Sequence, residues 1–361
     1  MRRLGSTVAR LHSMRRASMA AMAKIDSIGS APSRLSLFTG FGTNPGALVA
    51  KTYLPPSLAP NAPLVVVLHG CTQNAAVYDR GSGWSELAER HGFAVLFPEQ
   101  ARSNNHNLCF NWYQATDARR ERGEAASIAQ MVRHMTATHG LDANQVFVNG
   151  LSAGGAMTSV MLACYPELFA GGAIIAGLPF GVAASVPEAL ERMRGHGLPS
   201  RRALASRIEN AADPRGPWPT LSVWHGTADR IVDIANADLI VDQWRDRGGL
   251  AGENGEVDSI AGHERTIWRD SAGRAALERI DIAGMGHGTP IDPRGDDGCG
   301  QAGPHMLDAG ICSTRHVAAS WGLTGKVRRR AANDRPAAET ERAVALKLAP
   351  LKLAPLKLAP R

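Results

Sequence analysis

Uninterrupted hydrophobic runs alternate with amphipathic segments through the middle of the chain. Leu64–Leu68 is the clearest run, and such a run is typical of a strand buried on both faces of a parallel sheet. Comparable strands are predicted at residues 93–97, 145–149, 172–176, 221–224 and 277–282. Helices are predicted at residues 83–91, 123–138, 156–163 and 234–244, and over the sheet edge within 182–218. This alternation predicts an α/β fold, with a doubly wound, mostly parallel sheet and helices on both faces.

The ends of this pattern set the expected boundaries of the domain. Residues 35–41 and 47–54 predict a hairpin, so one α/β domain is expected over 35–325. Residues 1–34 are expected to form a basic leader that is disordered or weakly helical. Residues 326–361 are expected to be a basic low-complexity tail, because Leu-Lys-Leu-Ala-Pro recurs there and its prolines prevent a continuous helix.

The net charge of +7 is concentrated in those two ends. Residues 1–34 carry a net charge of +6 and residues 326–361 a net charge of +7, which leaves −6 for residues 35–325. A mildly acidic body without a groove-reading motif argues against nucleic-acid binding. With 44% hydrophobic and 20% charged residues, the composition is that of a soluble globular protein.

No membrane span or export signal is expected from the sequence. Spanning a bilayer takes roughly 18 apolar residues or more, and no run approaches that length. The longest run, Gly171–Ala184, is interrupted by Pro179 and several glycines, which favours a buried strand followed by a loop. The arginine pairs at 2–3 and 15–16 are not followed by a continuous apolar segment, so neither is predicted to be a secretory or twin-arginine signal.

Candidate chemistry begins at Gly150-Leu151-Ser152-Ala153-Gly154, directly behind the predicted strand 145–149. Glycines two positions before and after Ser152 allow a tight strand-to-helix turn that holds the serine hydroxyl out at the top of the sheet. This is the nucleophile elbow of α/β-hydrolases, and the helix predicted at 156–163 supplies the context that the motif needs.

A serine nucleophile needs a histidine base that is oriented by a carboxylate, and α/β-hydrolases carry them in the order serine, acid, histidine. Asp229 follows the strand predicted at 221–224, and His287 lies between glycines after the strand predicted at 277–282. The spacings of 77 and 58 residues suit one strand–helix unit for each step. We therefore expect Ser152 to be the nucleophile, His287 the general base and then acid, and Asp229 the group that holds the imidazole tautomer.

Other acids and histidines fit these roles less well. His225 is expected to brace the turn that carries Asp229. The remaining candidates lack the loop context of the expected pair. Asp233 is expected at the start of the next helix and Asp238 within it, and Asp281 is expected within a strand. No strand-then-glycine pattern precedes His263 or His305. For Asp281 an ion pair or solvent contact is expected instead.

Two backbone N–H groups are expected to stabilise the developing oxyanion. One belongs to Ala153, directly after the nucleophile, and the other to Cys71, in the loop that begins with His69-Gly70 after the first buried strand. An ordinary strand-end turn is the alternative reading of His69-Gly70. No cofactor or metal site is expected, because Cys299 and Cys312 have no C-x-x-C partner.

Five cysteines are an odd number, so they cannot all be paired within one chain. Cys164 is expected to be a small buried residue in the helix after the elbow. Cys71 and Cys109 are expected in loops beside the site. A disulfide between them is left open by the sequence and is favoured if the protein meets an oxidising compartment.

Taken together, these motifs resemble those of the polyhydroxybutyrate (PHB) depolymerase family of esterases. The resemblance spans about 35–325 and rests on six segments: 68–73, 109–113, 150–155, 224–229, 284–288 and 310–314. It implies a catalytic domain that cleaves esters of 3-hydroxyalkanoates, polymeric or small, through an acyl-enzyme. It also places the family's triad on Ser152, Asp229 and His287, and implies action outside the cell, with a cytoplasmic location as the alternative.

Several functional alternatives stay open. No linker or separate substrate-binding module is recognisable, so soluble oligomers and other short esters are candidate substrates beside the polymer. Trp112 is expected either to line the acyl site or to brace the Cys109 loop. Feruloyl, acetylxylan or general short-chain esterase activity is the alternative within the enzyme class. A non-catalytic scaffold and a surface-binding protein acting through its basic ends are the alternatives outside it.

Overall fold

The structure, a computed structural model, describes residues 33–211, 218–250, 252, 254–295 and 298–325. The expected basic leader, apart from its last two residues, and the expected low-complexity tail lie outside the described residues. Arg34 contacts the body of the protein, because its guanidinium donates to the hydroxyl of Tyr53 at 2.8 Å and pairs with Glu89.

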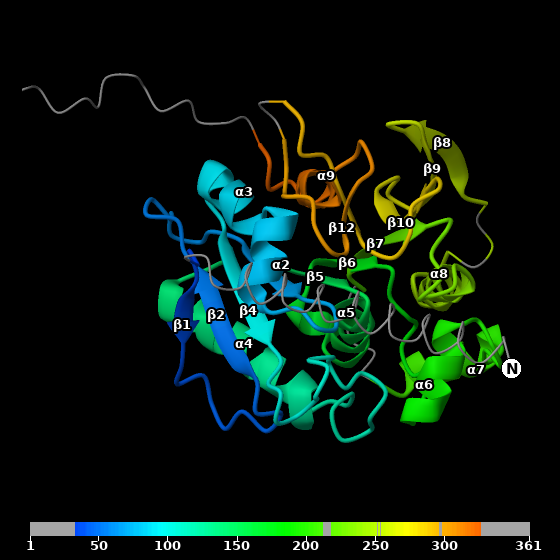
Figure 1. Cartoon of the computed structure of the whole chain (residues 1–361), viewed down its shortest axis with the longest axis horizontal. Helices are drawn as coiled ribbons and strands as arrows, with labels where there is room; N and C mark the ends of the chain where they lie inside the picture. Colours follow the sequence, from blue (N-terminus) through cyan, green and yellow to red (C-terminus); the bar gives the residue numbers. More distant parts are fainter. Residues whose placement is uncertain (1–32, 212–217, 251, 253, 296–297, 326–361) are drawn as a thin grey trace, which may run out of the picture. The chain divides into compact units, whose positions relative to one another are not determined.

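A ten-stranded sheet runs through the described residues in the order β1-β2-β4-β3-β5-β6-β7-β10-β9-β8 (Figure 1). Its central strands are parallel: β4 (Ala94–Glu99), β3 (Leu64–Leu68), β5 (Val146–Leu151), β6 (Gly171–Ile175), β7 (Thr220–Gly226) and β10 (Ala275–Ile282). Antiparallel strands complete both sides: β2 (Val49–Tyr53) and β1 (Ser36–Phe38) beside β4, and β9 (His263–Arg269) and β8 (Glu256–Ile260) beside β10. The predicted mostly parallel sheet and its opening hairpin are confirmed.

Helices cover both faces of this sheet, as Figure 1 shows. One face carries α4 (Gly123–His139), α5 (Ala153–Cys164), α6 (Val186–Met193), α7 (Arg201–Glu209) and α8 (Ala235–Arg247). The other carries α2 (Ala75–Ser82), α3 (Trp84–His91) and α9 (Ser313–Ser320). Strand β3 explains the two layers, since Leu64, Val66 and Leu68 join the first core while Val65 and Val67 join the second. The strand is therefore buried on both faces, as its apolar run predicted.

Helices α3, α4, α5 and α8 lie where helices were predicted, although α5 begins at Ala153 rather than near 156. The elements that were not predicted include α2, β8, β9 and α9. Helix α2 ends at Gly83, whose φ of 76° separates it from α3, and its N-terminus is capped by the side chain of Asn74. Two short helices broken by one left-handed glycine do not produce a long apolar periodicity.

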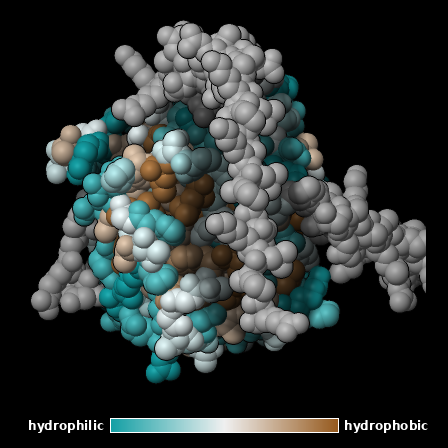
Figure 2. All heavy atoms as spheres, turned by 90° about the vertical axis from the view of Figure 1, so that its left-hand side faces the viewer, coloured by the Kyte–Doolittle hydropathy of each residue, from teal (hydrophilic) through white to brown (hydrophobic). Residues whose placement is uncertain are grey.

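Smaller elements complete the architecture. A 3₁₀ turn, η1 (Pro166–Leu168), follows α5, and β11 (Thr289–Ile291) pairs in parallel with β12 (Met306–Asp308) outside the main sheet. Figure 2 views the β1 side of the molecule, where hydrophobic residues lie in separate patches among hydrophilic ones. No described helix combines the length and apolar character that a bilayer crossing requires.

Candidate active site

Ser152 lies at a sharp turn between β5 and α5. Its φ of 56° and ψ of −117° are strained for a residue with a side chain, and its N–H donates to the carbonyl of Ile175 in β6 at 2.9 Å. Hydrogen bonding to the neighbouring strand holds the turn in this conformation. The residue is 8% exposed, so its side chain is largely shielded while it projects from the carboxyl end of the strand.

The flanking glycines are required by close packing. A Cβ on Gly150 would lie 2.3 Å from the carbonyl oxygen of Gly154, and a Cβ on Gly154 would lie 2.2 Å from the carbonyl oxygen of Leu68. Both distances are shorter than real contacts of this kind. The first turn of α5 is therefore pressed against the ends of β5 and β3, which brings the elbow beside the loop that follows β3.

Asp229 and His287 are joined directly. The Nδ1 of His287 lies 2.7 Å from Oδ2 of Asp229, and the Asp229 side chain is fully buried. Its other oxygen, Oδ1, accepts the N–H groups of Ile231 at 2.8 Å and Val232 at 3.0 Å. The carboxylate therefore accepts three hydrogen bonds, which hold it in one orientation.

These contacts determine how the pair is protonated. Burial alone would raise the pKa of Asp229, but the hydrogen bond from His287 and the two backbone N–H groups hold that pKa below its usual value. Asp229 is thus a carboxylate, which can only accept a hydrogen bond. His287 must carry its proton on Nδ1, which leaves Nε2 as the basic nitrogen.

The loops that carry the acid and the histidine are bonded to one another. The N–H of Ala228 donates to the carbonyl of Met285 at 3.0 Å, and the N–H of Gly284 donates to Oγ1 of Thr227 at 2.8 Å. A Cβ on Gly226 would lie 2.3 Å from the same Met285 oxygen, so the end of β7 touches the histidine loop. Backbone contacts therefore set the acid–histidine distance.

The competing residues have other partners. Asp281 pairs with Arg279 at 2.9 Å, which confirms the ion pair expected for it. Asp238 also pairs with Arg279, and Asp233 uses Oδ1 to accept the N–H of Ala235. His225 donates from Nε2 to the carbonyl of Val232 at 2.8 Å, which confirms that it braces the Asp229 turn.

The loop after β3 is fixed by covalent and hydrogen bonds. Cys71 is joined to Cys109 by a disulfide, and the N–H of Thr72 donates to the carbonyl of Asn107 at 2.7 Å. Among the hydrogen bonds of the described residues, none uses the N–H of Cys71 or that of Ala153. Both N–H groups are thus free to donate to a ligand.

His69 controls the peptide that contains the Cys71 N–H. Burial lowers the pKa of His69, so its imidazole is neutral. Its Nε2 accepts the N–H of Gln100 at 3.1 Å, so the proton is on Nδ1, which donates to the carbonyl of Gly70 at 2.8 Å. In a trans peptide the Gly70 carbonyl and the Cys71 N–H point in opposite directions, so this bond also orients the Cys71 N–H.

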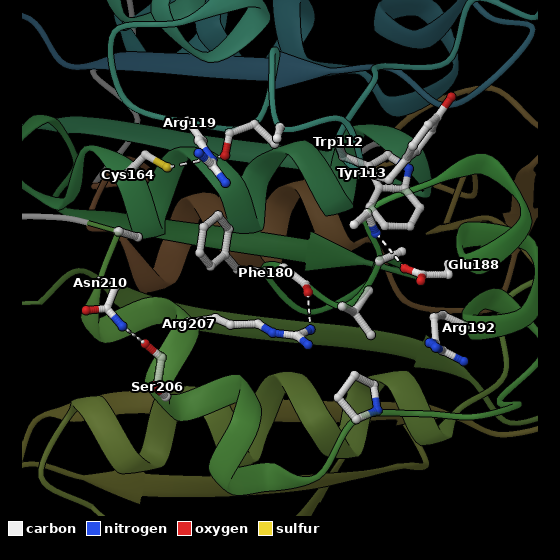
Figure 3. Close-up of a pocket in the computed structure, with 18 of the residues that line it drawn as sticks. Trp112, Tyr113, Arg119, Cys164, Phe180, Glu188, Arg192, Ser206, Arg207 and Asn210 are labelled. Atoms are coloured by element: carbon white, nitrogen blue, oxygen red, sulfur yellow. Dashed lines mark hydrogen bonds between the residues drawn. The ribbon is translucent and has the colours of Figure 1, made fainter.

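A buried carboxyl supports the loop that carries Trp112. Glu124, at the start of α4, accepts the N–H of Asn111 at 2.7 Å, the side-chain amide of Asn111 at 2.7 Å and that of Gln100 at 2.5 Å. Burial raises its pKa to about 7 in spite of these donors. Trp112, which is 6% exposed, packs edge-on against Tyr113 and lines a pocket with Phe180 (Figure 3).

The expected triad residues all follow the carboxyl ends of neighbouring parallel strands, β5, β7 and β10, with β6 between the first two. The structure joins Asp229 to His287, but the described hydrogen bonds include none between the Ser152 hydroxyl and His287. Catalytic hydrogen bonds are often long without substrate. No cluster of three potential metal-ligating side chains occurs within the described residues.

Three supporting features were missed by the sequence analysis. Cys299 and Cys312 form a second disulfide, whereas Cys164 is free and buried, as expected. His305, which its context argued against, contacts His287: its Nδ1 lies 3.1 Å from the His287 carbonyl oxygen and the two rings meet edge to face. Glu124 was not singled out, since an acid in the first turn of a helix is common.

Comparison with known proteins places the chain in a family. Residues 48–267 match the family model described as esterase PHB depolymerase. The chain is 42% identical to poly(3-hydroxyalkanoate) depolymerase C of Paucimonas lemoignei over 81% of its own length and 70% of that protein. It is 34% identical to acetylxylan esterase A of Aspergillus oryzae, over 71% of its length and 85% of that protein.

Solved structures agree with the sequence relatives. The acetyl xylan esterase from Aspergillus awamori aligns with a TM-score of 0.63 and 29% identity, covering 70% of this chain and 93% of that one. The α/β-hydrolase fold predicted from the sequence is confirmed, as is an enzyme that hydrolyses carboxylic esters. The protein belongs to the PHB depolymerase family of esterases.

Proposed function

We propose that the protein hydrolyses esters of poly- or oligo(3-hydroxyalkanoates) through a Ser152–His287–Asp229 triad. In the first step Nε2 of His287 takes the hydroxyl proton while Oγ of Ser152 bonds to the ester carbonyl carbon. The bond from that carbon to the leaving alcohol then breaks, and His287 returns the proton to the departing oxygen. Water repeats the sequence on the acyl-enzyme, which releases the acid and restores Ser152.

The oxyanion of each tetrahedral intermediate is assigned to the N–H groups of Cys71 and Ala153. Donors held in place before the reaction stabilise this charge without reorganising during the step. The disulfide to Cys109 and the His69–Gly70 hydrogen bond supply that rigidity for the Cys71 peptide. Asp229 keeps the His287 tautomer that leaves Nε2 free.

The observation that carries the mechanism is the 2.7 Å contact between His287 and the buried Asp229 carboxylate. It joins the acid and the glycine-flanked histidine that the sequence analysis selected, and both lie downstream of a strained serine elbow. The 42% identity to a poly(3-hydroxyalkanoate) depolymerase supports the substrate class. Two disulfides support a location in an oxidising compartment, and we propose that the enzyme acts outside the cell.

The Ser152→Ala variant tests the nucleophile. Removing the attacking oxygen is expected to lower kcat for p-nitrophenyl butyrate by about 10⁶-fold, to the background level. Thermal unfolding should stay within a few degrees of wild type. Turnover near the wild-type rate in a folded variant would contradict the assignment.

Acetylxylan or feruloyl ester hydrolysis is the second candidate function. The 34% identity to acetylxylan esterase A and the match to the Aspergillus awamori structure favour it. Product analysis with amorphous polyhydroxybutyrate, its dimer, acetylated xylan, feruloylated sugars and short acyl esters separates the candidates. Release of 3-hydroxybutyrate at a higher kcat/KM than acetate or ferulate supports the first; the reverse order supports the second.

A further inference from the structure

A pocket of about 700 Å³ lies beside α5, outside the residues assigned to the reaction. It is bordered by the loop that carries Trp112, the end of α5, the segment after β6, and helices α6 and α7 (Figure 3). Ser152, Asp229 and His287 are not among the residues that line it. The pocket thus needs an explanation apart from the triad.

The pocket is strongly cationic. Four arginines line it: Arg119, Arg120, Arg192 and Arg207. Among the described residues, the lining includes one acid, Glu188. Arg120 is neutralised by Glu167 at 2.7 Å. The other three form no ion pair with a carboxylate within the described part of the chain.

The hydrogen bonds of these arginines leave donors unused. Arg207 donates to the carbonyl of Gly181, and Arg192 donates from Nη1 to the carbonyl of His196 at 2.9 Å. A backbone carbonyl is neutral, so these hydrogen bonds do not offset the positive charges of the two guanidinium groups. In addition, Nε of Arg192 is buried and has no hydrogen-bond partner within the described residues. This N–H can therefore donate to an acceptor from outside the protein, such as a water molecule or an anion.

The remaining lining is mostly apolar. Trp112 and Phe180 are 6% and 9% exposed and form part of the wall, together with Val182 and Ala183. Figure 3 shows Trp112 and Arg192 toward one end of the pocket, Cys164 and Arg119 toward the other, and Arg207 extending between them. Such a surface suits a ligand with an apolar body and one anionic group, and a guanidinium fork fits a carboxylate.

The pocket is within reach of the nucleophile. Ile175, whose carbonyl accepts the Ser152 N–H, precedes Phe180 by five residues, a span of at most ~18 Å of extended chain. That connection follows α5, because Leu178 accepts the hydroxyl of Ser159 at 2.7 Å. The wall of the pocket at Phe180 is therefore no farther from the elbow strand than a short linear oligomer can span.

We propose that the arginine pocket binds the free carboxylate end of an oligo(3-hydroxyalkanoate) whose ester lies at Ser152. This inference rests on the proposed function. Each linear oligomer has one hydroxyl end, one carboxylate end and an uncharged body of alkyl and ester groups. The carboxylate end belongs to the alcohol that leaves when the tetrahedral intermediate collapses to the acyl-enzyme and His287 protonates the departing oxygen, so the pocket is a leaving-group site for the acylation step.

The test compares three substrates: the 3-hydroxybutyrate trimer as free acid, the same trimer capped as its N-methyl amide, and p-nitrophenyl butyrate. Wild type is expected to show a kcat/KM about tenfold higher for the free acid than for the amide, as one charge-assisted hydrogen bond would produce. Arg207→Gln and Arg192→Gln should remove most of that preference and leave p-nitrophenyl butyrate hydrolysis unchanged. Arg202→Gln, an exposed arginine on α7 outside the lining, is the matched control and should behave as wild type.

The outcomes separate this inference from the proposed function. Equal kcat/KM for acid and amide in wild type overturns the carboxylate site, even if a variant fails to fold, and leaves the substrate class standing. Turnover of p-nitrophenyl butyrate with no cleavage of either trimer overturns the substrate class as well. A preference for carboxylate found only with glucuronate-bearing acetylated xylo-oligosaccharides assigns the pocket to sugar acids and overturns the proposal.

Discussion

At the scale of single residues, the buried carboxylate of Asp229 acts only as a hydrogen-bond acceptor. Its Oδ1 is occupied by two backbone N–H groups and its Oδ2 by His287, in a fully buried position. In the proposed mechanism, the imidazolium of His287 is therefore stabilised by a charge whose position cannot relax. The role that we propose for Asp229 is to orient and stabilise the histidine, and no proton needs to reach the carboxylate.

Replacing this carboxylate without changing its shape isolates that role. Asp229→Asn is expected to lower kcat by about 10⁴-fold, because an amide nitrogen beside His287 favours the wrong tautomer. Asp233→Asn, at the competing position, should retain nearly full activity. Esterase assays of both variants decide the point, and a larger loss in Asp233→Asn would reassign the acid.

Glu124 shows a residue-scale effect that depends on pH. Its pKa is raised to about 7 in the fold from an ordinary value of 4.5, so the folded state keeps a proton that the unfolded chain has already lost. The free energy of unfolding should therefore fall by about 3 kcal/mol from this group as the pH rises from 4.5 through 7.

The side chain introduced by Glu124→Gln has no ionisable group, so this variant lacks the decline in the free energy of unfolding. Relative to wild type, its free energy of unfolding is expected to rise by about 3 kcal/mol between pH 4.5 and 8. Groups such as Asp229, whose pKa is lowered, titrate in both proteins and cancel from the comparison. Urea titrations at several pH values measure the difference, and parallel curves for the two proteins would contradict the buried, protonated carboxyl.

Asp229 and His287 could be predicted from the sequence because each lies in the loop that follows an apolar strand. Glu124 could not be predicted, because its partners Gln100 and Asn111 come from other segments of the chain. The same holds for His305, which contacts His287 from a position 18 residues farther along the chain. Local patterns identify residues at strand ends, whereas contacts between loops depend on how those loops fold.

At the scale of elements, burial decides what the sequence could predict. Strands β3 and β5 are fully buried, so their apolar runs were unambiguous. Strand β8 is largely exposed, with acidic residues at 256 and 258, and Arg265 of β9 pairs with Asp258. An edge hairpin that is held by cross-strand charges has no apolar run to detect. The sequence therefore did not predict that β9 and β8 extend the sheet.

The junction of β5 and α5 is the element most sensitive to added volume. Gly154→Ala would place a Cβ 2.2 Å from the Leu68 carbonyl, so the helix must shift away from β3. We expect a loss of about 3 kcal/mol in the free energy of unfolding and a parallel loss of activity. Gly303→Ala is the control, since a Cβ there meets nothing within 4 Å and should leave both quantities unchanged.

At the scale of the whole molecule, the two disulfides constrain different parts of one fold. Cys71–Cys109 spans 38 residues and ties the loop after β3 to the Trp112 loop, whereas Cys299–Cys312 spans 13 residues near β11 and β12. Both constrain the unfolded chain, but the first also holds the peptide assigned to the oxyanion. Stability and catalysis should therefore respond differently to the two bonds.

Chain entropy predicts a cost of about 4 kcal/mol for removing the longer loop constraint and about 3 kcal/mol for the shorter one. Paired serine substitutions at 71 and 109 should in addition lower kcat about tenfold or more, because the Cys71 N–H is no longer held in place. Paired substitutions at 299 and 312 should reduce stability alone. Denaturant unfolding and esterase rates, measured on both double variants well below their melting temperatures, separate these effects. Equal kcat losses in the two variants would mean that the Cys71–Cys109 bond stabilises the fold without positioning an oxyanion donor.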